Sequence, residues 1–279
     1  MGIVDFILNL AGLLVWLNWR SIRFDPLVRR LPATLMGTLR PAAPAKFRRW
    51  HLLALIGGLL ILRAAAYRWL APFSGFKLDV GLITLSFRSD SFAGMVLFSV
   101  LSFSAMLGVF YVMLLLLSLL RGPEQIHRFV KIPLGRIDDW SAPVKLLLPF
   151  LVMAIFWGVL SAVLSGVKIG GFLILPPMPA MSLRIEQSVV IALGVYLLWK
   201  FPIALLLVIH LLSSYIYFGK HPFWVYVNVV AQKILRPLNK LPLRIGRVDF
   251  APLLGLALVF LIAVAAGKGL MEIYRRLPI

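Results

Sequence analysis

Few side chains in this sequence have the types and spacing that chemistry needs. The four histidines, His51, His127, His210 and His221, stand far apart, and the chain has no cysteine. A metal site needs several such ligands close together, and a disulfide, a thiolate nucleophile or a CxxCH haem attachment needs cysteine. No glycine-rich phosphate loop, nucleophile elbow or zinc-binding helix motif occurs. We therefore expect no catalytic residue, no metal site and no cofactor, and a protein that is not an enzyme.

His210 is the one histidine that lies deep inside a long apolar stretch. A histidine in that position is either a packing residue with a hydrogen-bonded ring or a ligand, for example to a haem shared with a partner protein. Because no second histidine or cysteine stands at ligand spacing, we expect packing.

The acidic residues are expected near the ends of the apolar stretches. The chain has ten Asp and Glu: Asp5 is expected near the outer end of the first span, and the others at the inner or outer face of the membrane. Cation and proton carriers commonly use carboxylates buried at mid-membrane, so this placement counts against a dedicated transporter. A pore lined by Ser99, Ser102 and Ser104 stays open as an alternative, although these serines also suit helix packing.

Three basic residues, Lys200, Arg63 and Arg68, lie inside or beside apolar stretches. A charge at mid-membrane is costly and usually marks function. Counted back from Gly219 at 1.5 Å per residue, Lys200 lies roughly 28 Å from the inner boundary, near the outer edge of the hydrocarbon. We therefore expect Lys200 to extend to the outer headgroups, and the same interpretation applies to Arg63 and Arg68.

The composition identifies the class of protein. Of 279 residues, 61% are hydrophobic and only 14% are charged, against roughly 25% charged in soluble domains. Apolar runs of about 18 residues or more recur, and each can cross a hydrocarbon core of about 30 Å as a helix. We expect an all-α polytopic membrane protein with about six transmembrane helices: Ile3–Trp19, Trp50–Ala71, Phe92–Leu120, Leu146–Gly166, Gln187–Phe218 and Phe250–Gly267.

The expected membrane topology accounts for most of the basic residues that give the chain its net charge of +19. Eight, five and six Lys and Arg fall in the loops 20–49, 121–145 and 213–252, and basic loops stay on the cytoplasmic side. The loops would join three hairpins, 1–72, 92–167 and 187–268, with both termini outside. We therefore expect a multi-pass protein of a bacterial cytoplasmic (inner) membrane that binds no nucleic acid directly.

The segments between the hairpins are short. Residues 73–91 alternate weakly and predict a β-hairpin on the outer surface, and the glycines and prolines of 167–186 predict a loop. Gly158, Ala162 and Gly166 recur at four-residue spacing and predict a face where another helix approaches closely.

A repeated motif occurs in two of the basic loops. The residues Pro133-Leu134-Gly135-Arg136-Ile137-Asp138, followed by Pro143, match Pro242-Leu243 and Gly246-Arg247-Val248-Asp249, followed by Pro252. In each copy a long helix, a basic inner loop and a returning helix form a hairpin. The motif therefore indicates an internal repeat.

The second of these loops contains an amphipathic segment between Pro222 and Leu241. Its apolar face would hold Trp224, Val227, Val230, Ala231, Ile234, Leu235 and Leu238, and its polar face Asn228, Gln232, Lys233, Arg236, Asn239 and Lys240. Such a helix lies in the inner headgroup layer, where each basic side chain contributes about 1 kcal/mol near anionic lipid, or it packs on a partner protein or the other repeat. The expected lipid or partner contacts are Lys220, Lys233, Arg236, Lys240, Arg244 and Arg247.

Backbone signals end this segment. Pro237 should end the helix, because proline donates no amide hydrogen bond and its ring clashes with the preceding turn. Gly246 should permit a tight turn. Asp249 should cap the N-terminus of the last span, unless Arg247 and Asp249 instead form a charged contact with another subunit.

The chain resembles the YggT family of small bacterial and plastid membrane proteins. The residues that carry the resemblance are Gly219-Lys220-His221-Pro222, Leu235-Arg236-Pro237-Leu238-Asn239-Lys240-Leu241-Pro242, Gly246-Arg247-Val248-Asp249 and Pro252. The resemblance is specific over Tyr196–Ala263 and partial over Phe92–Gly166. The N-terminal hairpin is longer and more basic than the family pattern.

The resemblance implies a non-enzymatic function. The family is implicated in osmotic and cation stress tolerance, in division or nucleoid organisation, and in assembly of a haem-bearing cytochrome complex in plastids. We expect a scaffold, assembly factor or accessory subunit of a membrane complex, with anionic lipid, other membrane proteins or further copies of itself as partners. The alternative is ion permeation linked to osmotic or cation stress.

Overall fold

Helices make up most of the protein. The computed structural model describes residues 3–21, 49–70, 75–80, 83–120, 130–166, 168–169, 172–173, 181–215, 222–238, 244–245 and 248–277. Within these ranges, five helices are long and apolar enough to cross a membrane: Trp50–Trp69, Phe92–Leu120, Ala142–Leu164, Met181–Ser214 and Ala251–Arg276. The expected α-helical membrane protein is confirmed at this level, while the number of spans and their grouping into hairpins stay predictions.

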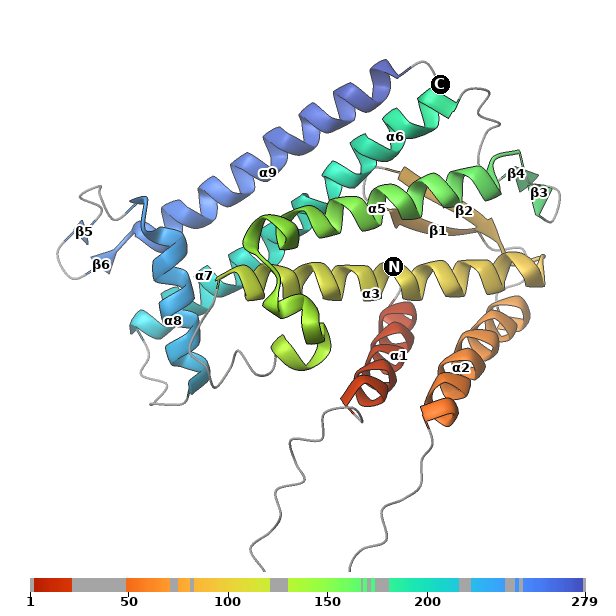
Figure 1. The fold of residues 1–279 in the computed structure, drawn as a ribbon, viewed down its shortest axis with the longest axis horizontal. Helices are drawn as coiled ribbons and strands as arrows, with labels where there is room; N and C mark the ends of the chain where they lie inside the picture. The colour runs from red at the N-terminus through yellow and green to blue at the C-terminus, as the bar shows by residue number, and fades with distance from the viewer. Residues whose placement is uncertain are drawn as a thin grey trace, which may run out of the picture. The chain divides into compact units, whose positions relative to one another are not determined.

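The chain divides into two compact units, and the first contains residues 1–76 and 88–107. It consists of α1 (Ile3–Ser21), α2 (Arg49–Leu70) and the first part of α3 (Phe92–Leu120) (Figure 1). Helices α1 and α2 pack against each other. Gly12 of α1 gives room to the ring of Phe103 of α3, because a Cβ at Gly12 would lie 2.8 Å from that ring.

A small β-hairpin precedes α3, as the sequence predicts. It is a two-stranded sheet of β1 (Gly75–Val80) and β2 (Ile83–Arg88). Leu85 and Phe87, two residues apart on β2, are buried, and on the exposed side Thr84 donates a 2.6 Å hydrogen bond to Asp79. The period of two residues between buried side chains is what a sheet with one covered face requires.

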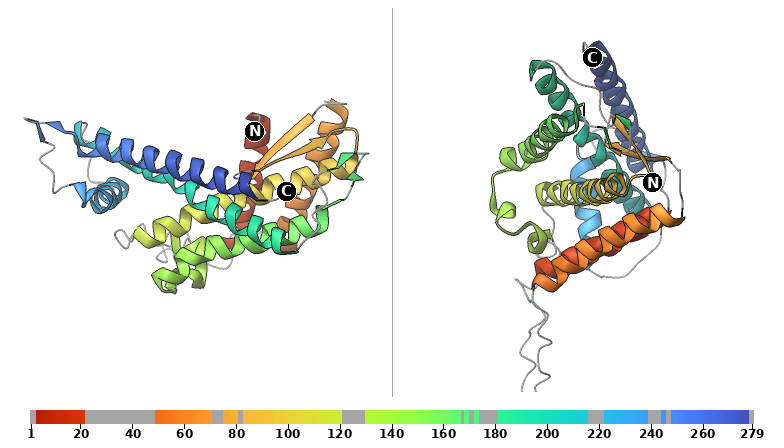
Figure 2. Two further views of the ribbon diagram at one scale, coloured as in Figure 1. Left: turned by 90° about the horizontal axis from the view of Figure 1, so that it is seen from above. Right: turned by 90° about the vertical axis from the view of Figure 1, so that its right-hand side faces the viewer.

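The second unit contains residues 77–87 and 108–279. Besides the second part of α3, it contains a helical segment at residues 130–134 and the helices α5 (Ala142–Leu164), α6 (Met181–Gly194), α7 (Lys200–Tyr215), α8 (Pro222–Leu235) and α9 (Ala251–Arg276). Helix α5 packs on α6, and α7 packs on both α8 and α9 (Figure 2). Two short antiparallel pairs complete it: β3 (Lys168–Ile169) with β4 (Phe172–Leu173), and β5 (Arg244–Ile245) with β6 (Val248–Asp249).

The prolonged apolar stretch 187–218 is interrupted by a change of helix type. A 3₁₀ segment, η2 (Val195–Trp199), joins α6 to α7. Pro202 explains its position, because proline donates no amide hydrogen bond and its ring crowds the carbonyl four residues earlier. Helix α6 also begins at Met181, inside the segment expected to be a loop, because Leu183, Gln187 and Ile191 place buried side chains at helical spacing.

Helix α9 lies antiparallel along this continuous element. A Cβ at Gly255 would lie 3.4 Å from Leu207, and one at Gly267 would lie 3.7 Å from Leu197. The later residue of α9 therefore contacts the earlier residue of the facing element, as an antiparallel arrangement requires. Interpolation between the two contacts places Lys200 opposite the region of Ala263, near the middle of α9 and not near its outer end, where counting back from Gly219 had placed it.

The packed face of α5 agrees with the predicted small-residue face only at Gly158, where a Cβ would lie 3.6 Å from Oγ of Ser188 on α6. Trp157, Ser161 and Leu164 are buried, whereas Ala162 and Gly166 are exposed. Gly166 lies beyond the helix and has a φ of 75°. Trp157 turns its indole toward α6, where its Nε1 donates to Oε1 of Gln187 at 3.3 Å. A large aromatic side chain that needs both burial and an acceptor thus decides which face packs.

The close contact at Gly255 generates a stability prediction. A Cβ at Gly255 would lie 2.6 Å from Cδ2 of Leu235, so Gly255→Val should push α8 away from α9 and lower the melting temperature in detergent by several degrees. Gly269→Val on the same helix is the control, because nothing lies within 4 Å of a Cβ there. Equal melting temperatures for the two variants would contradict the packing of α8 on α9.

Candidate functional site

Helix α8 is amphipathic, and its apolar face packs against protein. Tyr226, Val227 and Val230 are buried with Leu206 of α7 and with Leu117 and Leu120 at the end of α3. Ala231 and Leu235 pack with Leu207 of α7 and with Val259 of α9. Of the two placements that the sequence left open, the structure shows this face on α7 and on the helix of the first repeat, so lipid does not cover it.

Tyr226 is a member of this face that the apolar pattern missed. Burial raises the pKa of its hydroxyl to about 12, so it is neutral at physiological pH. The aromatic body of a tyrosine packs like an apolar residue, which is the signal that could have identified it.

The opposite side of α8 is polar and basic toward the C-terminal end. Gln232, Lys233 and Arg236 are exposed. Nζ of Lys233 donates to the carbonyl oxygen of Leu120 at 3.3 Å, and a cation is favourable at the C-terminus of α3, where the helix dipole is negative. The described part of the predicted contact surface is therefore this pair, Lys233 and Arg236, which we call the α8 basic end.

The other predicted residues are placed only in part. Pro222 begins α8, Pro237 stands in the turn that follows Leu235, and Pro252 is buried in the first turn of α9. Arg244 and Asp249 belong to β5 and β6 and pair with each other in the ladder. Outside the described residues lie Gly219, Lys220, Lys240, Pro242, Gly246 and Arg247.

Asp249 does not occupy the N-cap position that the sequence predicted for it. Helix α9 begins at Ala251, and Phe250 holds the N-cap position without a side-chain hydrogen bond. Asp249 precedes the cap and takes part in the β5–β6 pair instead. Gly135, the counterpart of Gly246 in the first repeat, has a φ of 59°, a conformation that glycine adopts without steric cost.

A buried polar cluster holds the loop motif of the first repeat. Ser118 of α3 donates to Oδ1 of Asp138 at 2.6 Å, and Nζ of Lys145 donates to Ser118 at 2.8 Å. Nζ of Lys145 also lies 3.8 Å from Oδ1 of Asp138, and both side chains are 2% exposed. The cluster joins α3, the 3₁₀ turn η1 (Gly135–Asp139) and α5.

This cluster has the residue types of a serine–lysine dyad but not its accessibility. Ser118 is fully buried, and its hydroxyl already donates to a carboxylate. A nucleophile needs a path for substrate and a base that takes its proton. The arrangement therefore acts as a structural lock at the motif Gly135–Asp138.

A second buried cluster lies in the first unit and was not expected. Arg63 of α2 is only 2% exposed and donates to Asp5 and Asn9 of α1, at 2.7 Å in each case. Ser102 of α3 accepts from Arg63 and from Asn9, at 3.0 Å each, and Tyr67 donates to Asp5. Arg63 thus does not extend to the headgroups, because a carboxylate and an amide on the neighbouring helix give it partners.

Arg68 and His210, two further residues considered in the sequence, both form hydrogen bonds. Arg68, in contrast to Arg63, is exposed and donates to the carbonyl of Asp90. Nδ1 of His210 lies 2.7 Å from Oδ1 of Asn228 on α8, which also accepts from Ser213 at 2.8 Å. His210 is thus a hydrogen-bonded packing residue. No group of three or more potential metal ligands occurs among the described residues.

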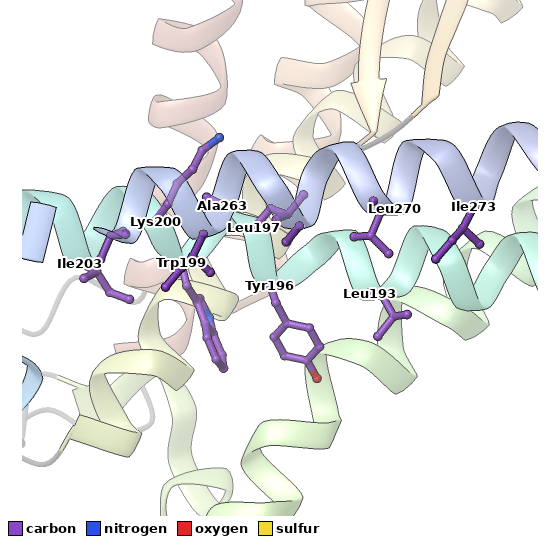
Figure 3. A pocket seen from close by; sticks show the side chains of 13 residues that line it. Leu193, Tyr196, Leu197, Trp199, Lys200, Ile203, Ala263, Leu270 and Ile273 are labelled. Atoms are coloured by element: carbon purple, nitrogen blue, oxygen red, sulfur yellow. The ribbon is translucent and has the colours of Figure 1, made fainter. Parts of the chain in front are cut away.

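An apolar groove of about 620 Å³ runs between α9 and the element formed by α6, η2 and α7 (Figure 3). Lys200 is the only charged residue among those that line it. The side chains of Tyr196 and Trp199 point to the other side, where they donate to the carbonyl of Leu146, at 2.5 Å, and to the carbonyl of Val112, at 3.2 Å (Figure 3).

The Arg63 cluster predicts the effect of removing one partner. Asp5→Asn should destabilise the protein by about 3 to 5 kcal/mol, because the guanidinium would stay buried without its carboxylate. Unfolding in mixed micelles measures this difference. The double variant Asp5→Leu/Arg63→Met should cost less than Asp5→Asn, and a larger loss in the double variant would contradict the ion pair. Glu272→Gln, which removes the exposed pair with Arg276, is the control.

Comparisons with known proteins assign no identity to this chain. No family model, no curated protein and no solved structure matches it. The similarity to the YggT family therefore stays a prediction from the residues of its loop motifs, and the function has to be argued from the sites described above.

Proposed function

We propose that this protein is a non-enzymatic scaffold, assembly factor or accessory subunit of a membrane complex, and a member of the YggT family. It binds anionic lipid or partner proteins through the basic residues of its inner loops. The observation that carries this proposal is the α8 basic end: the apolar face of α8 is buried in the protein, whereas Lys233 and Arg236 are exposed.

The packing of α8 explains how such a surface would be held in place. Its apolar face contacts α7 and the end of α3, so the helix is supported by both repeats. Oδ1 of Asn228 accepts a hydrogen bond from Ser213 of α7 and lies 2.7 Å from Nδ1 of His210, and these contacts fix the rotation of α8. Side chains on a helix supported in this way present a defined surface, which a partner recognises more readily than a mobile loop.

The proposed topology has six spans in three hairpins, with the basic loops in the cytoplasm and both termini outside a bacterial inner membrane. The placement of Lys and Arg supports it, since basic loops remain on the cytoplasmic side. A reporter fused after Ile279 should be active only outside the cytoplasm.

Ion permeation is the alternative, and the contacts of the serines do not favour it. Ser102 accepts from Arg63 and Asn9 within the packed helices of the first unit. The groove beside Lys200 has apolar walls. Reconstituted protein should therefore carry no potassium or sodium flux down an imposed gradient, and a selective flux lost on substitution of Lys200 would contradict the scaffold.

The α8 basic end can be tested directly. Lys233→Gln/Arg236→Gln should lower the enrichment of phosphatidylglycerol over phosphatidylcholine around the purified protein several-fold, or release a co-purifying partner, because two exposed charges are lost. Raising the salt concentration should weaken the wild-type interaction in the same direction.

The matched control is Lys268→Gln/Arg275→Gln, which removes two exposed charges from the far part of α9. An unchanged melting temperature of the α8 variant would show that the fold is intact. If neither lipid enrichment nor partner recovery differs between the two variants, the α8 basic end is not the contact surface.

A further inference from the structure

Helix α9 is poorly covered by the rest of the protein. Only 6% of its apolar window is buried, against 44% for the element formed by α6, η2 and α7. Among the exposed residues of α9 are Leu261, Ile262 and Val264. A spanning helix with so little cover faces either lipid or another protein.

The groove lies along this uncovered helix. Its α9 wall includes the small residues Ala263, Ala266 and Gly269. The opposite wall includes Leu193, Leu197 and Ile203 (Figure 3). Small residues on one wall let a helix backbone approach closely, which is how helices associate in membranes without a hydrophobic driving force.

Lys200 gives the groove its one charge. It lies opposite the region of Ala263, inside the apolar part of α9, and its Nζ lies 4.9 Å from the ring centroid of Phe201. In the part of the chain that the structure describes, Arg63 pairs with Asp5 and Lys145 with Asp138, but no carboxylate pairs with Lys200. An ionisable residue in a spanning segment normally has a partner of opposite charge.

We propose that the groove binds a transmembrane helix of a partner protein and that an Asp or Glu of this helix pairs with Lys200. The inference rests on the proposed scaffold function and names its partner by chemistry. A lipid fits less well, because its acyl chain carries no charge and its phosphate stays at the interface. A carboxylate on a helix can reach the level of Lys200 at any depth.

The absence of cysteine makes the groove easy to test. Ala266→Cys places a thiol in the groove, and Ala265→Cys places one on the same helix outside it. A photoreactive maleimide, benzophenone maleimide, is attached to each variant in native membranes and activated. We expect an adduct only at Ala266→Cys, in which the cross-linked peptide is a transmembrane segment that contains Asp or Glu.

Charge dependence is the second part of the experiment. Lys200→Met should lower the adduct yield about fivefold or more, whereas Lys200→Arg should keep it. Exchange of the two charges, Lys200→Asp with the partner carboxylate changed to Lys, should restore it. Adducts with lipid alone, with a second copy of this chain, or with a helix that lacks a carboxylate would overturn the inference, as would a yield independent of Lys200.

The outcome separates this inference from the proposed function. If a partner still co-purifies through the α8 basic end while no adduct forms in the groove, the groove inference fails and the scaffold function stands. If no partner co-purifies and none is cross-linked, both fail.

Discussion

The constraint on which this structure depends is that a charge among apolar helices needs a partner. In a low-dielectric interior an unpaired charge is costly, whereas a pair held by hydrogen bonds is tolerated. Arg63 meets this requirement with Asp5 and Asn9, and Lys145 meets it with Asp138 and Ser118. Arg63 thereby joins α2 to α1, and the hydrogen bond from Lys145 to Ser118 joins α5 to α3, so polar contacts help determine which helices lie together. Lys200 has no such carboxylate among the described residues, and the same constraint is the reason for proposing that another protein supplies one.

The two copies of the loop motif use this constraint in different ways. In the first, Asp138 is locked to Ser118 and Lys145, and Gly135 adopts a positive φ at the turn. A helix precedes the motif in both copies: Val130 and Leu134 pack on α3 in the first, and α8 buries its apolar face on α7 and on the end of α3 in the second. In the first copy the exposed Lys131 pairs with Asp139 at 3.0 Å, whereas in the second Lys233 and Arg236 are exposed at the end of α8. This difference makes the second loop the better candidate for binding a partner.

Much of the fold followed from the sequence, because long apolar runs and helical periodicity are local properties. The limits predicted for Phe92–Leu120 agree with α3, and α8 ends at Leu235, just before Pro237. Other expectations depended on contacts that no local pattern contains. Of the small residues of α5, Gly158 lies against α6 as predicted, but Ala162 and Gly166 are exposed, because the packed face is the one that carries Trp157, whose acceptor Gln187 lies on α6. Arg63 was assigned to the headgroups, because its partner Asp5 lies on another helix.

The sequence by itself determined that this is a helical protein with five helices that can cross a membrane, basic loops, a repeated loop motif and an amphipathic segment before the last helix. Composition, run length and period decide these properties, since each helix satisfies its own backbone hydrogen bonds. Only the tertiary structure decided that α8 packs against other helices of the protein and that Ser118 is fully buried and hydrogen-bonded. It also decided that a groove with one lysine lies along α9. These depend on which side chains meet across helices, because burial and pairing are properties of contacts between distant residues.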